Sequence, residues 1–163
     1  MQSRDYSFTF AASADMPMLA GWLRQPEVAL WWGDPAEQEA LLAADLDDPN
    51  MLMRIVSYKG HPFAYVQDYD VHNWPQPFLA HLPAGSRGID TFIGDVAMIG
   101  MGHGPPYLRL LAEELLADGA PLLVTDPDPA NGRARRAYKK AGFSGDRQVE
   151  TEEGPAILMT FTG

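Results

Sequence analysis

The sequence predicts an α/β fold in which helices flank a mixed β-sheet. Two apolar strands joined by the turn dipeptide Lys59-Gly60 indicate antiparallel hairpin pairing. A strand–helix–strand order between residues 88 and 125 indicates the kind of crossover that joins parallel strands. A chain of 163 residues suits one compact core, so we expect residues 1–163 to form a single domain.

The first half of the chain is expected to begin with a strand and a short helix. Alternating apolar residues mark strands, whereas apolar residues three or four positions apart mark helices. Prolines at both ends of residues 26–35 predict a break that carries the Trp31-Trp32 pair. The elements expected here are, in order, a strand at 6–11, a helix at 13–24, the break, a helix at 36–44, and strands at 51–58 and 61–69.

The second half opens with an irregular stretch, residues 70–87, whose prolines and glycine predict a surface loop rather than a domain linker. A proline in the first turn favours a helix start at Pro105, and Gly142 is a typical helix stop. A turn at Glu153-Gly154 is expected to join the last two strands. The further elements expected are a strand at 88–93, a glycine-rich stretch at 94–104, a helix at 105–118, a strand at 121–125, a helix at 131–141, and strands at 148–152 and 156–161.

Charge and cysteine content narrow the classes of partner and chemistry that the chain is expected to have. The net charge is −10, from 12 basic and 22 acidic residues, which disfavours binding to nucleic acid and favours a cationic small molecule. An acidic surface that serves solubility alone is the alternative. The chain has no cysteine, which excludes a disulfide framework and a thiolate nucleophile. No secretory signal or long apolar run is evident, so we expect no membrane interaction and a cytoplasmic location.

The segment from Ile99 to Gly104 has three glycines on alternating positions between a strand and a helix. Such a segment can turn tightly and, with the helix N-terminus, form an anion cradle suited to a pyrophosphate. A plain strand-to-helix turn has the same appearance, and the spacing fits neither a Walker loop nor a dinucleotide fingerprint. Within it, the His103 side chain is expected to face outward.

The most informative run extends from Thr125 to Phe143. It is a strand end, a proline-stiffened turn, an Asn131 helix cap, a basic helix and a glycine stop. Tyr138 lies seven residues after Asn131, two turns along one helix face. Its phenol is able to donate a proton to a leaving thiolate, or the ring packs the helix against the sheet.

This run resembles the acetyl-CoA-binding end of GNAT acetyltransferases, with Asn, Ala, Tyr, Lys and Gly-Phe in that order. The Asp-Pro-x-Pro-x-Asn form at 126–131 is similar to the aminoglycoside 6′-N-acetyltransferase branch. The resemblance implies a GNAT fold, with a mostly antiparallel sheet that is splayed at the acetyl-CoA site. Further matching segments are Arg87-Gly88-Ile89-Asp90, Gly100-x-Gly102-x-Gly104, Glu153-Gly154-Pro155-Ala156 with Met159, and, more weakly, Trp31-Trp32 and Gln67-Asp68-Tyr69.

The resemblance also implies roles. Asp90 is the expected general base and Tyr138 the general acid, for direct attack of an amine on the thioester in a ternary complex. The residues implied in binding acetyl-CoA are Ile89, Thr91, Phe92, Ile99, Gly100, Met101, Gly102, His103, Gly104, Asn131, Ala134 and Tyr138. Those implied in binding the acceptor are Trp31, Trp32, Gln67, Asp68, Tyr69, Asp70, Asp90 and Asp126. Trp31, Trp32, Asp68, Tyr69, Asp70 and Trp74 are expected on loops; the alternative for the two tryptophans is that they plug the core.

Two departures from the family leave other functions open. Ile99 and Met101 stand where GNAT loops usually have polar or basic residues, so phosphate contacts would come from backbone N–H groups. A non-catalytic acyl-CoA-binding module is therefore one alternative. Because siderophore-type acyltransferases have related sequences, an N-acyltransferase acting on a hydroxylysine is another, and a plain interaction domain is a third. The expected partner is a small-molecule amine, for a monomer or homodimer. His72 and His81 lack accompanying ligands, so no metal is expected.

Overall fold

The computed structural model describes residues 2–163 and divides the chain into two compact units. Unit 1 comprises Met1–Asp68 and Asp90–Met101, and unit 2 comprises Tyr69–Ile89 and Gly102–Gly163. Strands β3 (His61–Asp70) and β4 (Arg87–Ile93) run through both units. Seven strands pair in the order β1-β2-β3-β4-β5-β7-β6, which confirms the mixed sheet. That the whole chain is one domain stays a prediction.

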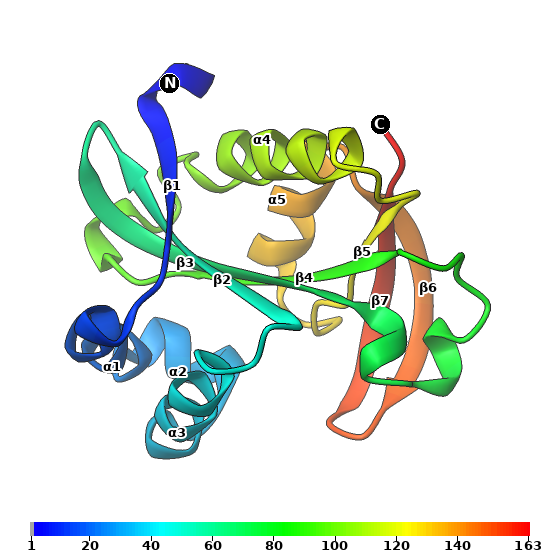
Figure 1. Ribbon diagram of the computed structural model, residues 1–163, viewed down its shortest axis with the longest axis horizontal. Coiled ribbons are helices and arrows are strands. Elements are labelled where there is room, and N and C mark those ends of the chain that lie inside the picture. Colours follow the sequence, from blue (N-terminus) through cyan, green and yellow to red (C-terminus); the bar gives the residue numbers. More distant parts are fainter. Residues whose placement is uncertain (1) are drawn as a thin grey trace. The chain divides into compact units, whose positions relative to one another are not determined.

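Unit 1 places three helices against its strands (Figure 1). Leu19, Leu23, Val28 and Leu42 from the helices pack with Met53, Ile55, Tyr65 and Phe92 from the strands. Met53 and Ile55 point to the same face of β2, because residues two positions apart in a strand share a face. The helices and strands of this unit are α1 (Met16–Leu23), α2 (Pro26–Trp32), α3 (Pro35–Asp45), β1 (Tyr6–Phe10) and β2 (Met51–Tyr58), together with the parts of β3 and β4 that belong to it.

The hairpin between β2 and β3 turns at the predicted dipeptide. Lys59 and Gly60 have φ values of 48° and 84°. Two successive positive φ angles are typical of the type I′ turn, whose twist matches that of the flanking strands. The neighbouring β1 pairs antiparallel with β2, with Tyr6 opposite Tyr58. The sequence therefore predicted the β2–β3 hairpin correctly, whereas the pairing of β1 with β2 comes from the structure alone.

The predicted break at residues 26–35 is wrong, because α2 occupies Pro26–Trp32. Proline is tolerated at the first helical position, where its missing N–H has no helical partner to lose. The helix ends at Gly33, whose φ is 100°. Asp34 then caps α3 by accepting a hydrogen bond from the Glu37 N–H at 3.0 Å. The break is thus two residues long.

Gly94 is the site of one stability prediction. It directly follows β4, and a Cβ added there would lie 2.1 Å from the Cγ of Trp22, whose ring packs edge-on against Phe92. We expect Gly94→Ala to lower the free energy of unfolding by about 1–3 kcal/mol, because the indole and α1 must shift. Gly21→Ala, in α1 with no neighbour within 4 Å of the added Cβ, is the control and is expected to be neutral or stabilising in urea unfolding. Equal values for both variants would contradict the clash.

Unit 2 confirms the predicted crossover. Strand β4 pairs in parallel with β5 (Leu123–Thr125), and α4 (Gly104–Ala117) lies between them in the sequence. Helix α5 (Gly132–Ala141) lies beside α4 (Figure 1), and a Cβ added at Gly104 would be 3.5 Å from that of Ala137. The last strands, β6 (Ser144–Thr151) and β7 (Gly154–Phe161), form an antiparallel hairpin.

Two expectations for unit 2 need correction. Residues 70–87 are more than a surface loop, since they form two short 3₁₀ turns and bury apolar side chains. Prolines disfavour regular strands in this segment, but they do not keep its apolar residues out of a core. The apolar side chains of this segment join a buried cluster whose members are Val71, Phe78, Leu79, Leu82, Val124, Val149, Ala156 and Leu158.

Strand β6 begins at Ser144 rather than at Gln148. Its first residues lack a clear strand pattern in the sequence because a register shift between Ser144 and Arg147 disturbs the alternation.

Candidate functional site

The glycine-rich segment turns where the sequence predicts it. The 3₁₀ turn Val96–Met98 is capped by Asp95, which accepts a hydrogen bond from the Ala97 N–H at 3.1 Å. Gly100 and Gly102 then have φ values of 73° and 87°, in the left-handed region that favours glycine. Helix α4 begins two residues later at Gly104, and Pro105 and Pro106 in its first turn have no N–H group to offer a ligand. The attraction of this helix end for an anion therefore depends on the remaining N–H groups and on the positive end of the helix dipole.

The expectation that His103 faces outward is wrong, because its side chain is buried, with 7% exposed. Its backbone is already helical as the N-cap residue of α4, so it shares a helix face with the buried Tyr107 four residues on. Burial lowers the pKa of the His103 imidazole, which favours the neutral ring at pH 7.

The distal run has the predicted caps. The Asn131 side chain accepts a hydrogen bond from the Ala134 N–H at 3.2 Å, and Gly142 ends α5 with φ of 115°. Tyr138 is 5% exposed, and its ring lies edge-on to that of Phe143 with centroids 5.4 Å apart. The packing interpretation of Tyr138 therefore holds for its ring. A role for its hydroxyl in proton transfer stays a prediction.

The turn before α5 is held by several hydrogen bonds. The Arg135 guanidinium donates to the Pro129 carbonyl at 2.9 Å, and the Asp128 side chain accepts from the Ala130 N–H at 2.8 Å. The Ile157 N–H of β7 donates to the Pro127 carbonyl at 2.8 Å. Asp126, half-buried at the end of β5, is carried by this fixed turn.

Unit 1 contains a chain of hydrogen bonds that ends at Asp90. The Tyr65 hydroxyl donates to Oε1 of Gln67 at 2.6 Å, and Nε2 of Gln67 donates to Oδ2 of Asp90 at 3.0 Å. The Thr91 hydroxyl donates to the Tyr65 carbonyl at 2.6 Å and so ties β4 to β3. Two predicted site residues, Gln67 and Asp90, are thus in direct contact.

Asp68, Tyr69 and Asp70 all lie in β3, which agrees with the strand predicted at 61–69 and corrects the expectation that these side chains stand on loops. The Asp68 side chain has no solvent exposure and forms an ion pair with Arg54 of β2. Tyr69 packs edge-on against Trp74 with ring centroids 5.5 Å apart, and Asp70 accepts from the His72 N–H at 2.9 Å. Regular pairing continues through these polar residues because a buried ion pair satisfies the charge that a core position would otherwise penalise.

The two tryptophans of α2 have different surroundings. Trp32 packs edge-on against Phe92 and Tyr65, with ring centroids 4.9 and 6.1 Å apart, so the core-plug alternative holds for it. Trp31 is 41% exposed and is available to a ligand. Phe92 lies in the same aromatic cluster, so its side chain supports the core.

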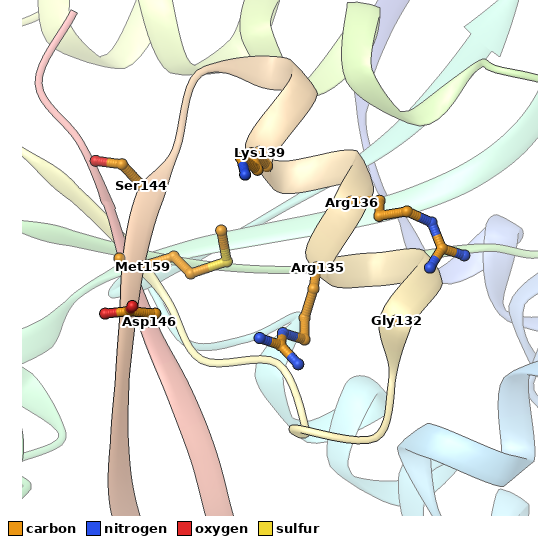
Figure 2. Close-up of a pocket in the computed structure, with 8 residues that line it drawn as sticks. Gly132, Arg135, Arg136, Lys139, Ser144, Asp146 and Met159 are labelled. Carbon is orange, nitrogen blue, oxygen red and sulfur yellow. The ribbon is translucent and has the colours of Figure 1, made fainter.

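A cavity of about 570 Å³ lies in unit 2 between α5 and the hairpin of β6 and β7 (Figure 2). Figure 2 shows the Met159 side chain pointing toward the helix and Arg136 pointing away from the strands. Three cations on α5 line this cavity in an otherwise acidic chain, so it suits an anionic group. Its lining residues are Gly132, Arg135, Arg136, Lys139, Ser144, Gly145, Asp146 and Met159. The sequence shows that this helix is basic but does not show the cavity. The i, i+3, i+4, i+7 spacing from Gly132 does indicate that the lining residues of α5 share one helix face.

Two searches of the described residues concern other kinds of site. Among residues 2–163, no group of three or more His, Cys, Asp or Glu side chains is arranged to hold a metal ion. Within the same residues, none of the helices combines the length and the hydropathy that crossing a bilayer requires.

Comparison with known proteins agrees with the geometry. Residues 11–151 match the acetyltransferase (GNAT) domain family. An aminoglycoside N(6′)-acetyltransferase type 1 from Klebsiella pneumoniae is 32% identical over 160 residues, covering 91% of this chain and 78% of the relative. A solved structure of AAC(6′)-Ib that contains acetyl-CoA has a TM-score of 0.85 at 30% identity, covering 97% of this chain and 93% of that one.

A second AAC(6′)-Ib structure, in complex with coenzyme A and kanamycin, has a TM-score of 0.84 at 31% identity and covers 96% of this chain and 94% of that one. The GNAT fold expected from the sequence is therefore confirmed, as is the resemblance read from residues 125–143. The chain belongs to the GNAT acetyltransferase family and is an acetyl-CoA-dependent N-acetyltransferase.

Proposed function

We propose that this protein transfers the acetyl group of acetyl-CoA to a primary amine of an aminoglycoside-type amino sugar. The observation that carries the proposal is the 32% identity to an aminoglycoside N(6′)-acetyltransferase over 91% of the chain. An acidic chain with a net charge of −10 suits a polycationic acceptor. A cytoplasmic location and a monomeric or homodimeric state stay predictions.

The residues present fit acetyl-CoA in two respects. The left-handed Gly100 and Gly102 shape the backbone of the loop without relying on side chains, which offsets the apolar residues Ile99 and Met101. The cations of the α5 cavity suit phosphate groups. The coenzyme supplies an activated acyl thioester, and we propose that residues 89–92, residues 99–104, Asn131 and Ala134 hold it.

Two side chains of the protein are proposed to move protons. Asp90 accepts the proton of the incoming ammonium, directly or through a water molecule, so that the neutral amine is able to attack. Tyr138 donates its phenolic proton to the sulfur of the leaving thiolate. The lack of cysteine agrees with direct attack in a ternary complex rather than with a cysteine-linked acyl-enzyme.

The acceptor is proposed to meet the exposed ring of Trp31 and the half-buried Tyr69, Asp70 and Asp126. An aromatic ring stacks on sugars, and carboxylates pair with ammonium groups. Trp32, Gln67 and Asp68, also predicted for this site, have core or network partners, so we propose that they support its shape.

The alternatives read from the sequence are not favoured, since the relatives reported above are aminoglycoside acetyltransferases. A panel of acceptor amines distinguishes the proposed function from these alternatives, and release of the coenzyme A thiol is the measurement. We expect turnover with kanamycin and ribostamycin, and little with N6-hydroxylysine or spermidine. Preference for hydroxylysine would overturn the proposed acceptor, and binding of acetyl-CoA with no turnover on any amine would favour the non-catalytic module.

Helix α5 provides a matched test of the coenzyme contact. We expect Lys139→Glu to weaken acetyl-CoA binding about fivefold in calorimetry at low salt, because it reverses a charge that lines the cavity. Lys140→Glu makes the same charge change at an exposed neighbour that does not line the cavity, and should weaken binding less than about twofold. Equal losses in the two variants would indicate a long-range charge effect instead.

Tyr138→Phe tests the proposed general acid. The ring packing against Phe143 is retained, so we expect the unfolding free energy and acetyl-CoA affinity to change little. Loss of the phenolic proton should lower kcat at least tenfold, a cost of about 1.4 kcal/mol on the barrier. Unchanged kcat in steady-state assays would leave Tyr138 with a packing role alone.

A further inference from the structure

The Gln67 side chain has one orientation that satisfies both of its neighbours. A primary amide has an oxygen that accepts and a nitrogen that donates. Because the Tyr65 hydroxyl donates to Oε1 at 2.6 Å, the amide nitrogen is directed to Oδ2 of Asp90 at 3.0 Å. A flipped amide would place two oxygen acceptors, those of Gln67 and Asp90, against each other.

Tyr65 is well suited to fix this orientation. Its side chain has no solvent exposure, and its ring packs against Phe92 and Trp32. Burial raises the pKa of the Tyr65 phenol, and the nearby carboxylates of Asp90, Asp45 and Asp68 raise it further. The phenol therefore keeps its proton throughout the working pH range and is always able to donate it.

We propose that Gln67 and Tyr65 are positioning residues for the reaction: Tyr65 orients the Gln67 amide, which holds the Asp90 carboxylate in one orientation and favours its ionised form. A hydrogen bond donated to a carboxylate stabilises the charged state, so the proton acceptor is ready before the amine arrives. This inference rests on the proposed role of Asp90 as base. It assigns Gln67 a task different from acceptor binding.

Other charged groups surround this hydrogen-bonded chain. Asp45 of α3 and Asp68 of β3 both act on Tyr65, and Arg54 of β2 pairs with Asp68. The N–H that Gln67 donates to Asp90 stabilises the ionised form of that carboxyl. Removing that donor should therefore raise the pKa of the Asp90 carboxyl.

The experiment compares Gln67→Leu, Tyr65→Phe and the double variant in the full chain. Carboxyl ¹³C NMR titration of Asp90 measures its pKa without turnover, and the pH profile of kcat/KM with kanamycin gives the acidic limb. We expect Gln67→Leu to move the Asp90 pKa and the acidic limb upward by about half to one pH unit. Tyr65→Phe should move both quantities in the same direction by less. The double variant should equal Gln67→Leu, because Tyr65 acts through Gln67.

Tyr6→Phe is the matched control, since Tyr6 is also buried in unit 1 but packs against Tyr58 and Phe63. It is expected to leave the Asp90 titration and the acidic limb in place. An unmoved Asp90 titration in Gln67→Leu, or additive shifts in the double variant, would overturn the positioning role. If the NMR shifts occur but Asp90→Asn retains full turnover, the proposed base fails while the orienting contact stands.

Discussion

Replacing Asp90 by asparagine is expected to lower turnover at least tenfold while acetyl-CoA binding is largely retained. Asparagine keeps the size of the side chain but is unable to accept a proton from an ammonium group. A tenfold loss corresponds to about 1.4 kcal/mol on the barrier, a modest demand for the removal of a general base. Steady-state kinetics with kanamycin give kcat, and calorimetry gives the acetyl-CoA affinity.

The control for this variant is Asp95→Asn. Asp95 also belongs to unit 1, but it pairs with His61 and caps the 3₁₀ turn at Val96–Met98. The His61 hydrogen bond is the main cause that lowers the pKa of the Asp95 carboxyl, so this carboxylate already has partners at the surface. We expect kcat within about twofold of the unmodified protein. Full turnover in Asp90→Asn would remove Asp90 from the mechanism.

Replacing Arg54 by methionine is expected to give the largest loss of stability, about 3–5 kcal/mol. The Asp68 side chain has no solvent exposure, and the substitution removes its ion-pair partner while keeping an apolar stem beside Phe10. Removing one member of a buried pair leaves a charge in a medium of low dielectric constant. Urea unfolding at pH 7 measures the loss.

Two further variants separate the pair from general effects. Arg54→Met with Asp68→Asn removes the buried charge as well, and we expect it to recover most of the lost stability. Arg24→Met breaks the ion pair between Arg24 and Glu39, whose side chains are 52% and 40% exposed, and should cost under about 1 kcal/mol. If Arg54→Met and Arg24→Met cost the same, the burial of Asp68 would not matter energetically.

Local patterns predicted much of the fold. The strand at residues 51–58, the Lys59-Gly60 turn, the Asn131 cap and the Gly142 stop all depend on neighbours in the sequence, and all are confirmed. The errors arose where the local signal was ambiguous. Pro26 starts a helix as readily as it ends one, and the polar start of β6 hides a strand behind a register shift.

In the candidate site too, some features follow from the local sequence and others only from tertiary packing. The sequence by itself determined the family, through the motif at residues 125–143, and the tight turn of the glycine loop, because both depend on residue type and spacing. The candidate acid and base are implied by the family resemblance and stay proposals. The tertiary structure alone decided that His103 is buried, that Asp68 pairs with Arg54, and that Tyr65 and Gln67 lead to Asp90. The Asp68–Arg54 and Gln67–Asp90 contacts join neighbouring strands, and their partners are chosen by sheet pairing and packing, which no local pattern records.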